Sequence, residues 1–352
     1  MRRSATLLVA RPILSLRASR AEAEKSLISS RMLALLLTVT FLALHVIAEK
    51  NNYPIIGVFT QPSNSNQGSC NGDCLYLAAS YVKYIEAAGA RVVPINYYAS
   101  TSELDNLFSS LNGFLFVGGG APFPASAQYV FDKTVKANDN GDYSPLWGTC
   151  MGFQWLLLSA TDAKIQLDPS DGTQMDAENY SIPLDFTANF KDSKLFGNAP
   201  TNIIDILGNQ NVTMNNHHYG IYPDHFDQTP ELRDFFNVLS LNNDRAGTAF
   251  VSTIEAKKYP IFGSQWHPEK NTFEWQMVDG VPYEAIDHSF DAVIIAQYTA
   301  NFFVEQARNS NHKFKDSTIE ANSLIYNYEA VRTSGDFVQK YFFPKDFRSY
   351  VE

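Results

Sequence analysis

The sequence predicts an α/β fold with a mostly parallel central sheet and helices on both faces. Short apolar runs typical of buried strands alternate with longer runs of helical spacing, which is the pattern of a parallel sheet wrapped by helices. The chain has 352 residues and is 45% hydrophobic, so it can bury a substantial core. A glycine-flanked cysteine, Cys150, stands between one such strand and one such helix. This position indicates a functional site at the end of the sheet.

The expected elements alternate along most of the chain. Apolar runs predict strands at 55–59, 91–95, 114–117, 145–148, 238–241, 249–254 and 261–265. Helical spacing predicts helices at 75–87, 102–111, 126–137, 153–159 and 287–308. The segment 165–215 is turn-rich and is expected to form strands and loops. From His312 onward, aromatic and charged residues indicate an extension docked on the domain.

The first 48 residues differ from the rest of the chain. A basic, serine-containing stretch precedes an apolar run at 32–47. That run is shorter than the roughly twenty apolar residues of a spanning helix and ends in small residues. We therefore expect a signal peptide cleaved near Ala48, secretory passage and no stable membrane span after processing. An uncleaved anchor, an upstream extension and a start at Met32 stay open as alternatives.

These patterns divide the chain into three segments. Residues 1–48 are expected to be a basic N-terminal extension plus signal peptide, 49–310 one catalytic domain, and 311–352 the docked C-terminal extension. No repeat and no second independent domain is predicted.

The charge balance excludes some classes of partner. The formal net charge is −10, and seven basic but two acidic residues precede residue 49, so the processed chain would carry about −15. Phosphates would be repelled by this average field, which argues against binding nucleic acid or an anionic membrane surface. Sequons at Asn179 and Asn211 are compatible with a secreted glycoprotein.

Two separated motifs predict a cysteine hydrolase. Cys150 lies in the sequence GTCMG, and His267 lies in QWHPE about a hundred residues later. A cysteine on a sharp strand-to-helix turn projects its sulfur over the end of the sheet, and small flanking residues are needed there. Gly148 and Gly152 meet that demand. The alternative for the first motif is a buried apolar cysteine beside two turn glycines.

These motifs resemble those of the class I glutamine amidotransferase-like superfamily. Two longer blocks, AASYVKYIEAAGARVVP at 78–94 and YPIFGSQWHPEK at 259–270, resemble the γ-glutamyl hydrolases. The resemblance implies cysteine-dependent hydrolysis of γ-glutamyl amide bonds, with folate poly-γ-glutamates trimmed to shorter forms and glutamate. It also implies a lysosomal, vacuolar or extracellular location and a homodimer.

Amide cleavage assigns a role to each motif residue. Cys150 is the expected nucleophile, and His267 its partner and later proton donor. Glu269 is expected to orient the imidazole, although a surface carboxylate would look the same. The superfamily resemblance places one oxyanion donor in the triple glycine 118–120, with Gly119 favoured, and the other at the Met151 amide. A flexible loop is the alternative for the glycines.

The resemblance also implies two substrate-binding positions. His217 matches a family histidine in an Asn-x-His context, with His218 beside it as the competing choice. Gln154 stands four residues after the nucleophile, where the family commonly has a glutamate, so any ionic role of that position is in doubt. The other histidines form no recognisable metal-ligand set, and no metal or cofactor is expected.

The three cysteines fit an oxidising compartment. Cys70 and Cys74 bracket a turn sequence that could bring their sulfurs together as a small disulfide, which would leave Cys150 free. A zinc half-site at the pair lacks a second half.

Three functions stay distinct at this point: the γ-glutamyl hydrolase, a glutaminase subunit that feeds a synthase, and a non-catalytic secreted binding protein. A polyglutamate substrate is anionic, and Lys83, Arg91 and Lys270 are candidate cations for it. The sequence does not decide between endo and exo cleavage.

Overall fold

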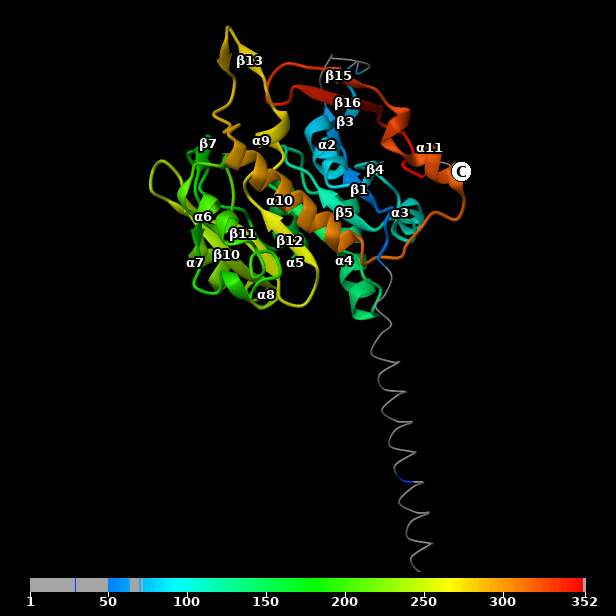
Figure 1. Ribbon diagram of the computed structural model, residues 1–352, viewed down its shortest axis with the longest axis horizontal. Coiled ribbons are helices and arrows are strands. Elements are labelled where there is room, and N and C mark those ends of the chain that lie inside the picture. Colours follow the sequence, from blue (N-terminus) through cyan, green and yellow to red (C-terminus); the bar gives the residue numbers. More distant parts are fainter. Residues whose placement is uncertain (1–28, 30–49, 64–69, 71, 351–352) are drawn as a thin grey trace, which may run out of the picture. The chain divides into compact units, whose positions relative to one another are not determined.

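The central sheet has eight strands in the order β4-β1-β5-β6-β12-β11-β10-β8 (Figure 1). The computed structural model describes residues 29, 50–63, 70 and 72–350, so the predicted signal peptide lies outside the described residues. The strands are β1 (Ile55–Phe59), β4 (Arg91–Ile95), β5 (Gly113–Phe116), β6 (Leu146–Thr149), β8 (Asp185–Phe186), β10 (Phe236–Asn243), β11 (Ala249–Ala256) and β12 (Ile261–Ser264).

The central sheet contains both parallel and antiparallel strands. The five strands from β4 to β12 are parallel, and β11, β10 and β8 continue the sheet antiparallel. The parallel strands β1, β5, β6 and β12 are buried along their whole length, as expected for strands covered on both faces. The predicted fold class, an α/β fold with a mostly parallel central sheet, is confirmed.

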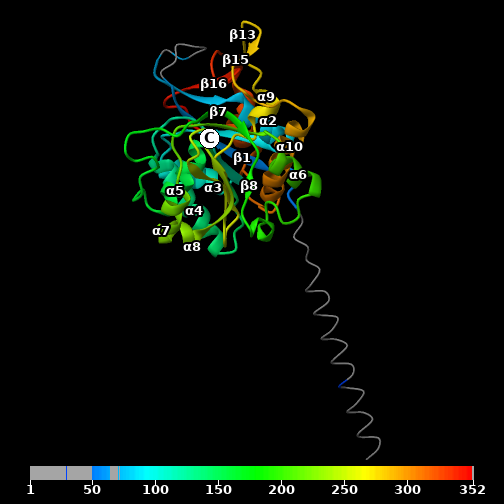
Figure 2. The same cartoon turned by 90° about the vertical axis from the view of Figure 1, so that its left-hand side faces the viewer.

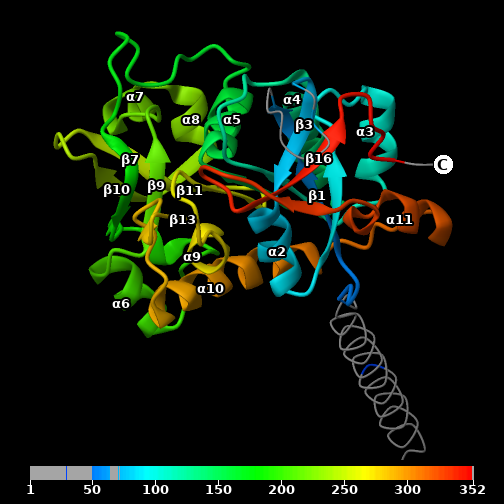
Figure 3. The same cartoon turned by 90° about the horizontal axis from the view of Figure 1, so that it is seen from above.

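Helices cover both faces of this sheet (Figure 3). One group comprises α2 (Ala79–Ala87), α6 (Thr201–Asn209), α9 (Lys270–Phe273) and α10 (Phe290–Ala307). The other comprises α3 (Thr101–Phe108), α4 (Ala125–Asp139), α5 (Met151–Ala160), α7 (Pro223–Gln228) and α8 (Pro230–Phe235). The longest, α10, begins where the Ser289 hydroxyl accepts from the Ala292 N–H, and it buries Ile295 and Phe303.

A second, four-stranded sheet has the order β15-β16-β3-β2. Its strands are β2 (Gln61–Ser63), β3 (Cys74–Ala78), β15 (Ala330–Arg332) and β16 (Gln339–Pro344). Strand β3 corrects the prediction that a helix starts at 75, because residues 74–78 pair with β2 and β16 before α2 begins. Leu75 and Leu77 face the main core, whereas Tyr76 pairs with Gln61 on one side and Phe342 on the other. The alternation of side chains along β3 could not be recognised in the sequence, because the strand lies within an apolar run.

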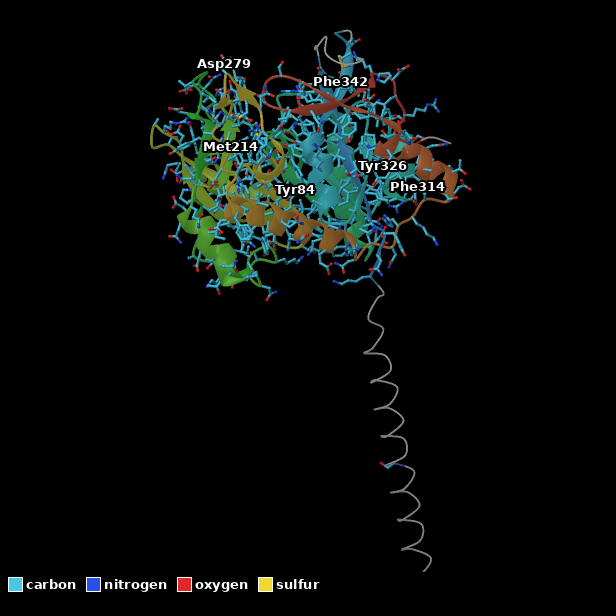
Figure 4. All side chains as sticks on the ribbon, turned by 45° about the horizontal axis from the view of Figure 1, so that its top comes forward. Tyr84, Met214, Asp279, Phe314, Tyr326 and Phe342 are labelled. Carbon is cyan, nitrogen blue, oxygen red and sulfur yellow. A yellow bond between two sulfur atoms is a disulfide. The ribbon has the colours of Figure 1, made fainter. Side chains whose placement is uncertain are left out.

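Smaller elements complete the body. They are β7 (Ala177–Ile182) paired with β9 (Thr213–His217), the hairpin of β13 (Met277–Val278) and β14 (Val281–Pro282), helix α11 (Ser317–Ser323), and short 3₁₀ turns η1 (Phe190–Asp192) and η2 (Ile325–Asn327). In Figures 1 and 2 the four-stranded sheet and the β13–β14 hairpin lie at the end of the body opposite α8. Figure 4 marks Asp279 in the hairpin turn and Phe342 on the four-stranded sheet.

The core is continuous beneath both sheets. Trp147, Trp155 and Trp266 are fully buried, and one cluster joins residues of β1, β6, β12, α5 and α10 with Leu77 of β3. Within the described residues, no helix has the length and apolar character needed to cross a bilayer.

Candidate active site

Cys150 occupies a strained turn between β6 and α5. Its φ is 53° and its ψ is −106°, a backbone region that residues with a side chain rarely adopt. A Cβ on Gly148 would overlap the Gly152 carbonyl, and a Cβ on Gly152 would overlap the Phe116 carbonyl. Both flanking glycines are therefore required sterically, as the motif predicts. The first helical N–H groups of α5 start at Met151, directly beside the sulfur.

His267 reaches the same point from the neighbouring strand. Strand β12 runs parallel to β6, with Ser264 opposite Thr149, so the carboxyl ends of the two strands coincide. The Cys150 N–H donates to the Ser264 carbonyl at 2.8 Å, which ties the elbow to β12. His267 follows three residues later, is 2% exposed and is hydrogen-bonded to the Cys150 side chain. Two strands that are distant in sequence thus bring the two predicted reacting residues together.

Glu269 is the third residue of the predicted triad with Cys150 and His267. Its Oε1 accepts from His267 Nδ1 at 2.8 Å, and its side chain is fully buried. The hydrogen bond fixes the imidazole with its other nitrogen free for the sulfur. The structure therefore places Glu269 in the interior, not on the surface.

The charges around His267 decide its protonation. Burial lowers the pKa of His267, but the Glu269 carboxylate, followed by Cys150, outweighs that effect and raises the pKa well above 6.5. With its pKa raised in this way, the His267 imidazolium persists through acidic and neutral pH. This is the state that can donate a proton to a leaving amine.

The glycine loop lies over Cys150. A Cβ on Gly118 would overlap the His267 ring and the Tyr81 hydroxyl and would press on the Cys150 Cβ, so this glycine lies against the reacting groups. Among the described residues, the N–H of Gly119 donates to no acceptor. The Ala121 N–H contacts Met151 Sδ at 3.0 Å, which joins the loop to the first residue of α5. The two predicted oxyanion donors are thus parts of one connected structure.

His217 and Gln154 meet at one carbonyl. Gln154 Nε2 donates to the Tyr219 carbonyl at 2.7 Å, and His217 Nδ1 lies 3.1 Å from the same oxygen. Burial, and secondarily the charge on His267, lower the pKa of His217 to about 3, so this imidazole is neutral. His218, by contrast, is partly exposed and faces Glu178 at the surface. The carbonyl of Asn216, the residue before His217, lies 3.8 Å from Cys150 Sγ.

Tyr81 is a site residue that the motifs did not single out. Its hydroxyl accepts from the Gly118 N–H at 2.8 Å and lies 3.3 Å from His267 Nδ1. Burial, followed by the Glu269 carboxylate, raises the pKa of Tyr81 well above 10, so the hydroxyl stays protonated. Tyr81 lies inside the block at 78–94 that carries the family resemblance, and that was the available signal.

A buried ion pair beside the triad was also missed. Lys270 pairs with Glu284, and Asn216 Nδ2 donates to the same carboxylate at 3.0 Å. Burial raises the pKa of Glu284, and Lys270 opposes that shift. Because Lys270 is already paired, it is poorly placed to meet a substrate carboxylate.

The other predicted cations have partners too. Arg91 starts β4, at the amino end of the parallel strands and away from the elbow, and pairs with Glu320. Lys83 Nζ donates to Gln339 Oε1 at 2.5 Å. Cys70 and Cys74 form a disulfide, and Cys150 is a free, buried cysteine.

An elbow cysteine with a buried histidine and glutamate, on an α/β sheet, defines a cysteine hydrolase. The model of the Peptidase C26 family matches residues 54–269. The chain is 47% identical over 289 residues to "Gamma-glutamyl hydrolase B" of Dictyostelium discoideum, covering 80% of each chain. It is 39% identical over 297 residues to "Gamma-glutamyl hydrolase" of Mus musculus, covering 82% of this chain and 89% of that one.

A plant relative extends the comparison. "Gamma-glutamyl hydrolase 1" of Arabidopsis thaliana is 35% identical over 285 residues, covering 79% of this chain and 78% of the relative. The chain therefore belongs to the peptidase C26 family, and the resemblance predicted from the two sequence blocks is confirmed.

Proposed function

We propose that this protein is a γ-glutamyl hydrolase that trims folate poly-γ-glutamates to shorter forms and glutamate. The observation that carries the proposal is the strained Cys150, hydrogen-bonded to the buried His267–Glu269 pair, with Gly118 of the glycine loop close to the Cys150 Cβ. The names of the relatives give the γ-glutamyl bond as the bond to be cleaved. The folate end of the substrate comes from the family resemblance.

Acylation uses the three groups in turn. The Cys150 sulfur attacks the γ-carbonyl carbon, and an S–C bond forms while the carbonyl oxygen becomes an oxyanion. We assign the stabilisation of that oxygen to the N–H groups of Gly119 and Met151. The C–N bond then breaks, and the His267 imidazolium gives its proton to the leaving amine. The products of this step are an acyl-enzyme thioester and the released glutamate or γ-peptide.

Deacylation reverses the roles. Water attacks the thioester carbonyl, His267 accepts its proton, and the S–C bond breaks to restore the cysteine. Glu269 keeps the imidazole oriented through both steps by its bond to Nδ1. No other group is needed for the proton balance.

The glutaminase alternative shares this chemistry, because a γ-glutamyl amide and the glutamine side-chain amide are both carboxamides at the same carbon. The two differ in the leaving group, which is an amino acid in one and ammonia in the other. A binding protein without activity would not need the strained elbow at Cys150.

Product analysis tests the proposal. The purified chain is incubated with a defined pteroyl-poly-γ-glutamate at acidic and neutral pH, beside free glutamine, with Cys150→Ala as control. Release of glutamate or shorter γ-peptides that depends on the cysteine, without ammonia from glutamine, is the expected result. Ammonia alone would assign the chain to the glutaminases, and no turnover of either substrate would favour the binding protein.

We further propose a processed, secreted glycoprotein that reaches the lysosome, the vacuole or the extracellular space and forms a homodimer. The Cys70–Cys74 disulfide supports an oxidising compartment, and both sequon asparagines, Asn179 and Asn211, are exposed. Intact mass before and after deglycosylation tests the sequons and the cleavage near Ala48. Sedimentation of the secreted protein tests the dimer, and a monomer at micromolar concentration would exclude it.

A further inference from the structure

One buried glutamine outside the predicted site touches the glycine loop. Gln61 starts β2, immediately after the first strand of the central sheet, and its side chain is 2% exposed. Its Nε2 donates to the Gly118 carbonyl at 2.7 Å. Its amide group also fills the space in which a Cβ on Gly119 would stand. The residue therefore holds the loop by a directional bond and by close contact.

This bond fixes the direction of the predicted oxyanion donor. The only cis peptide bond among the described residues is at Pro169, so the peptide between Gly118 and Gly119 is trans. In a trans peptide the C=O and the N–H point in opposite directions. A carbonyl held by Gln61 therefore leaves the Gly119 N–H directed away from Gln61. The preceding N–H, that of Gly118, is held separately by the Tyr81 hydroxyl.

The loop needs such a restraint because it is made of glycine. Residues without a Cβ cross between backbone regions at little cost, so a Gly-Gly peptide can rotate and present its carbonyl in place of its N–H. A carbonyl dipole aimed at a developing oxyanion would repel it, and one donor would be lost as well. Loss of one such donor typically costs about 100- to 1000-fold in kcat.

We propose that Gln61 is a positioning residue for the hydrolysis: it locks the Gly118–Gly119 peptide in the orientation that stabilises the oxyanion. The inference rests on the proposed function, since Gly119 is a donor only if Cys150 attacks a carbonyl. Gln61 acts through the backbone and is not required to touch the substrate.

The test replaces Gln61 with a side chain of similar length that lacks the amide. Gln61→Met removes the donor and keeps most of the volume, and Gln61→Glu keeps the shape but brings a carboxylate against the Gly118 carbonyl. Gln339→Met on β16 is the matched control, a glutamine of the same sheet whose side chain meets Lys83 and not the loop. Thermal unfolding of each variant reports whether the fold is kept.

Three readouts separate positioning from a structural role. We expect kcat on a γ-glutamyl substrate to fall by about 10- to 100-fold in Gln61→Met, somewhat less than for a lost donor because the loop still samples the correct orientation. KM should change little. Affinity for a γ-glutamyl aldehyde, whose thiol adduct carries the tetrahedral oxygen, should fall with kcat. Alkylation of Cys150 by iodoacetamide, which forms no oxyanion, should keep its rate.

Each opposite result overturns the inference. An unchanged kcat in Gln61→Met would show that the bond is not needed, and an alkylation rate that falls with kcat would show a collapsed site. Equal losses in Gln339→Met would assign the effect to the sheet as a whole. If Gln61→Met does not fold, Gln61→Glu must show the same split between kcat and alkylation. A wild-type chain that cleaves no γ-glutamyl bond would instead refute the proposed function.

Discussion

The two largest sheets of the described residues contribute to the site in different ways. The central sheet carries the proposed reacting groups: Cys150 follows β6 between two sterically required glycines, and His267 follows β12. The four-stranded sheet supplies no reacting atom. It joins β2 and β3, near the start of the described chain, to β16 near its end, and it carries Gln61 against the glycine loop.

This difference separates chemistry from positioning. The groups proposed to exchange bonds and protons each lie in a short sequence motif, whereas Gln61 lies in a sheet that pairs residues more than 250 positions apart, such as Ala78 with Lys340. Damage to the central motifs should remove activity outright, and damage to the four-stranded sheet should weaken it through geometry.

The largest effect should come from the central sheet. Cys150→Ala removes the nucleophile, and we expect turnover to fall by roughly 10⁴-fold or more, since residues that act as a unit fail together. The side chain is small and the turn is kept, so the unfolding temperature should change little. Turnover and a thermal melt of the same preparation measure both quantities. Activity near the wild-type level would assign the chemistry elsewhere.

The next prediction compares the truncation of one buried phenylalanine in the four-stranded sheet with that of one in the central sheet. Phe343 on β16 and Phe236 on β10 are each 1% exposed and belong to the main core cluster. Truncation to alanine should reduce the free energy of unfolding by about 3 to 5 kcal/mol in both cases. At a temperature where both variants are folded, only Phe343→Ala should also lose kcat, because it loosens the sheet that carries Gln61. Equal kcat values would remove the distinction between the sheets.

Substitution of Glu269 tests how the charge of its carboxylate supports the proposed chemistry. Glu269→Gln removes the group that contributes most to the raised pKa of His267. We expect kcat/KM to fall about 100-fold and its alkaline limb to move to lower pH, because the imidazolium now loses its proton earlier. A pH profile from 4 to 11 measures both, since the raised pKa of His267 is about 10 in the wild type. An unmoved alkaline limb would show that Glu269 does not set the protonation of His267.

The smallest predicted effect concerns His217, and it is an effect on the stability of the fold. Its pKa is about 3 in the folded protein, against about 6.5 in an unfolded chain, so only the unfolded state binds the proton between these values. His217 therefore supports the fold fully above pH 6.5, and this support is lost as the pH falls towards 3. Between pH 6.5 and 5 we expect a loss of about 2 kcal/mol in the wild type.

The matching variants are His217→Gln, which should remove that part of the pH dependence, and His218→Gln as the control at a partly exposed neighbour. Denaturant unfolding at the two pH values gives the difference. The same slope in the wild type and in His217→Gln would mean that the buried imidazole does not titrate as described.

The sequence pointed to the proposed reacting residues more directly than to the residues that contact them. Cys150 and His267 could be found because a sharp turn and a strand end restrict the residue types at fixed spacings. The helix expected at 75–87 was wrong in its first residues, since the pairing of β3 with β16 leaves no local trace. Gln61 and Tyr81 had no motif of their own, because each acts on a backbone group that any sequence would present.

The same reasoning explains why the positions of the candidate substrate cations could not be predicted from the sequence. Arg91 and Lys83 were candidates by charge alone, and charge does not reveal which end of a strand faces the site. The structure shows Arg91 at the amino end of β4 and Lys83 beside Gln339. Both assignments required the topology.

The two outermost strands of the central sheet also bear on how the protein behaves in concentrated solution. An exposed border strand offers unpaired backbone groups on which another molecule can add its own strand, and this is a common route to aggregation. Here β8 has two residues, and β4 contains Pro94, while the Asn96 N–H beyond it donates to the Ser349 hydroxyl. Proteolytic trimming of the C-terminal extension would uncover the β4 border, so we expect such nicked protein to precipitate before it unfolds.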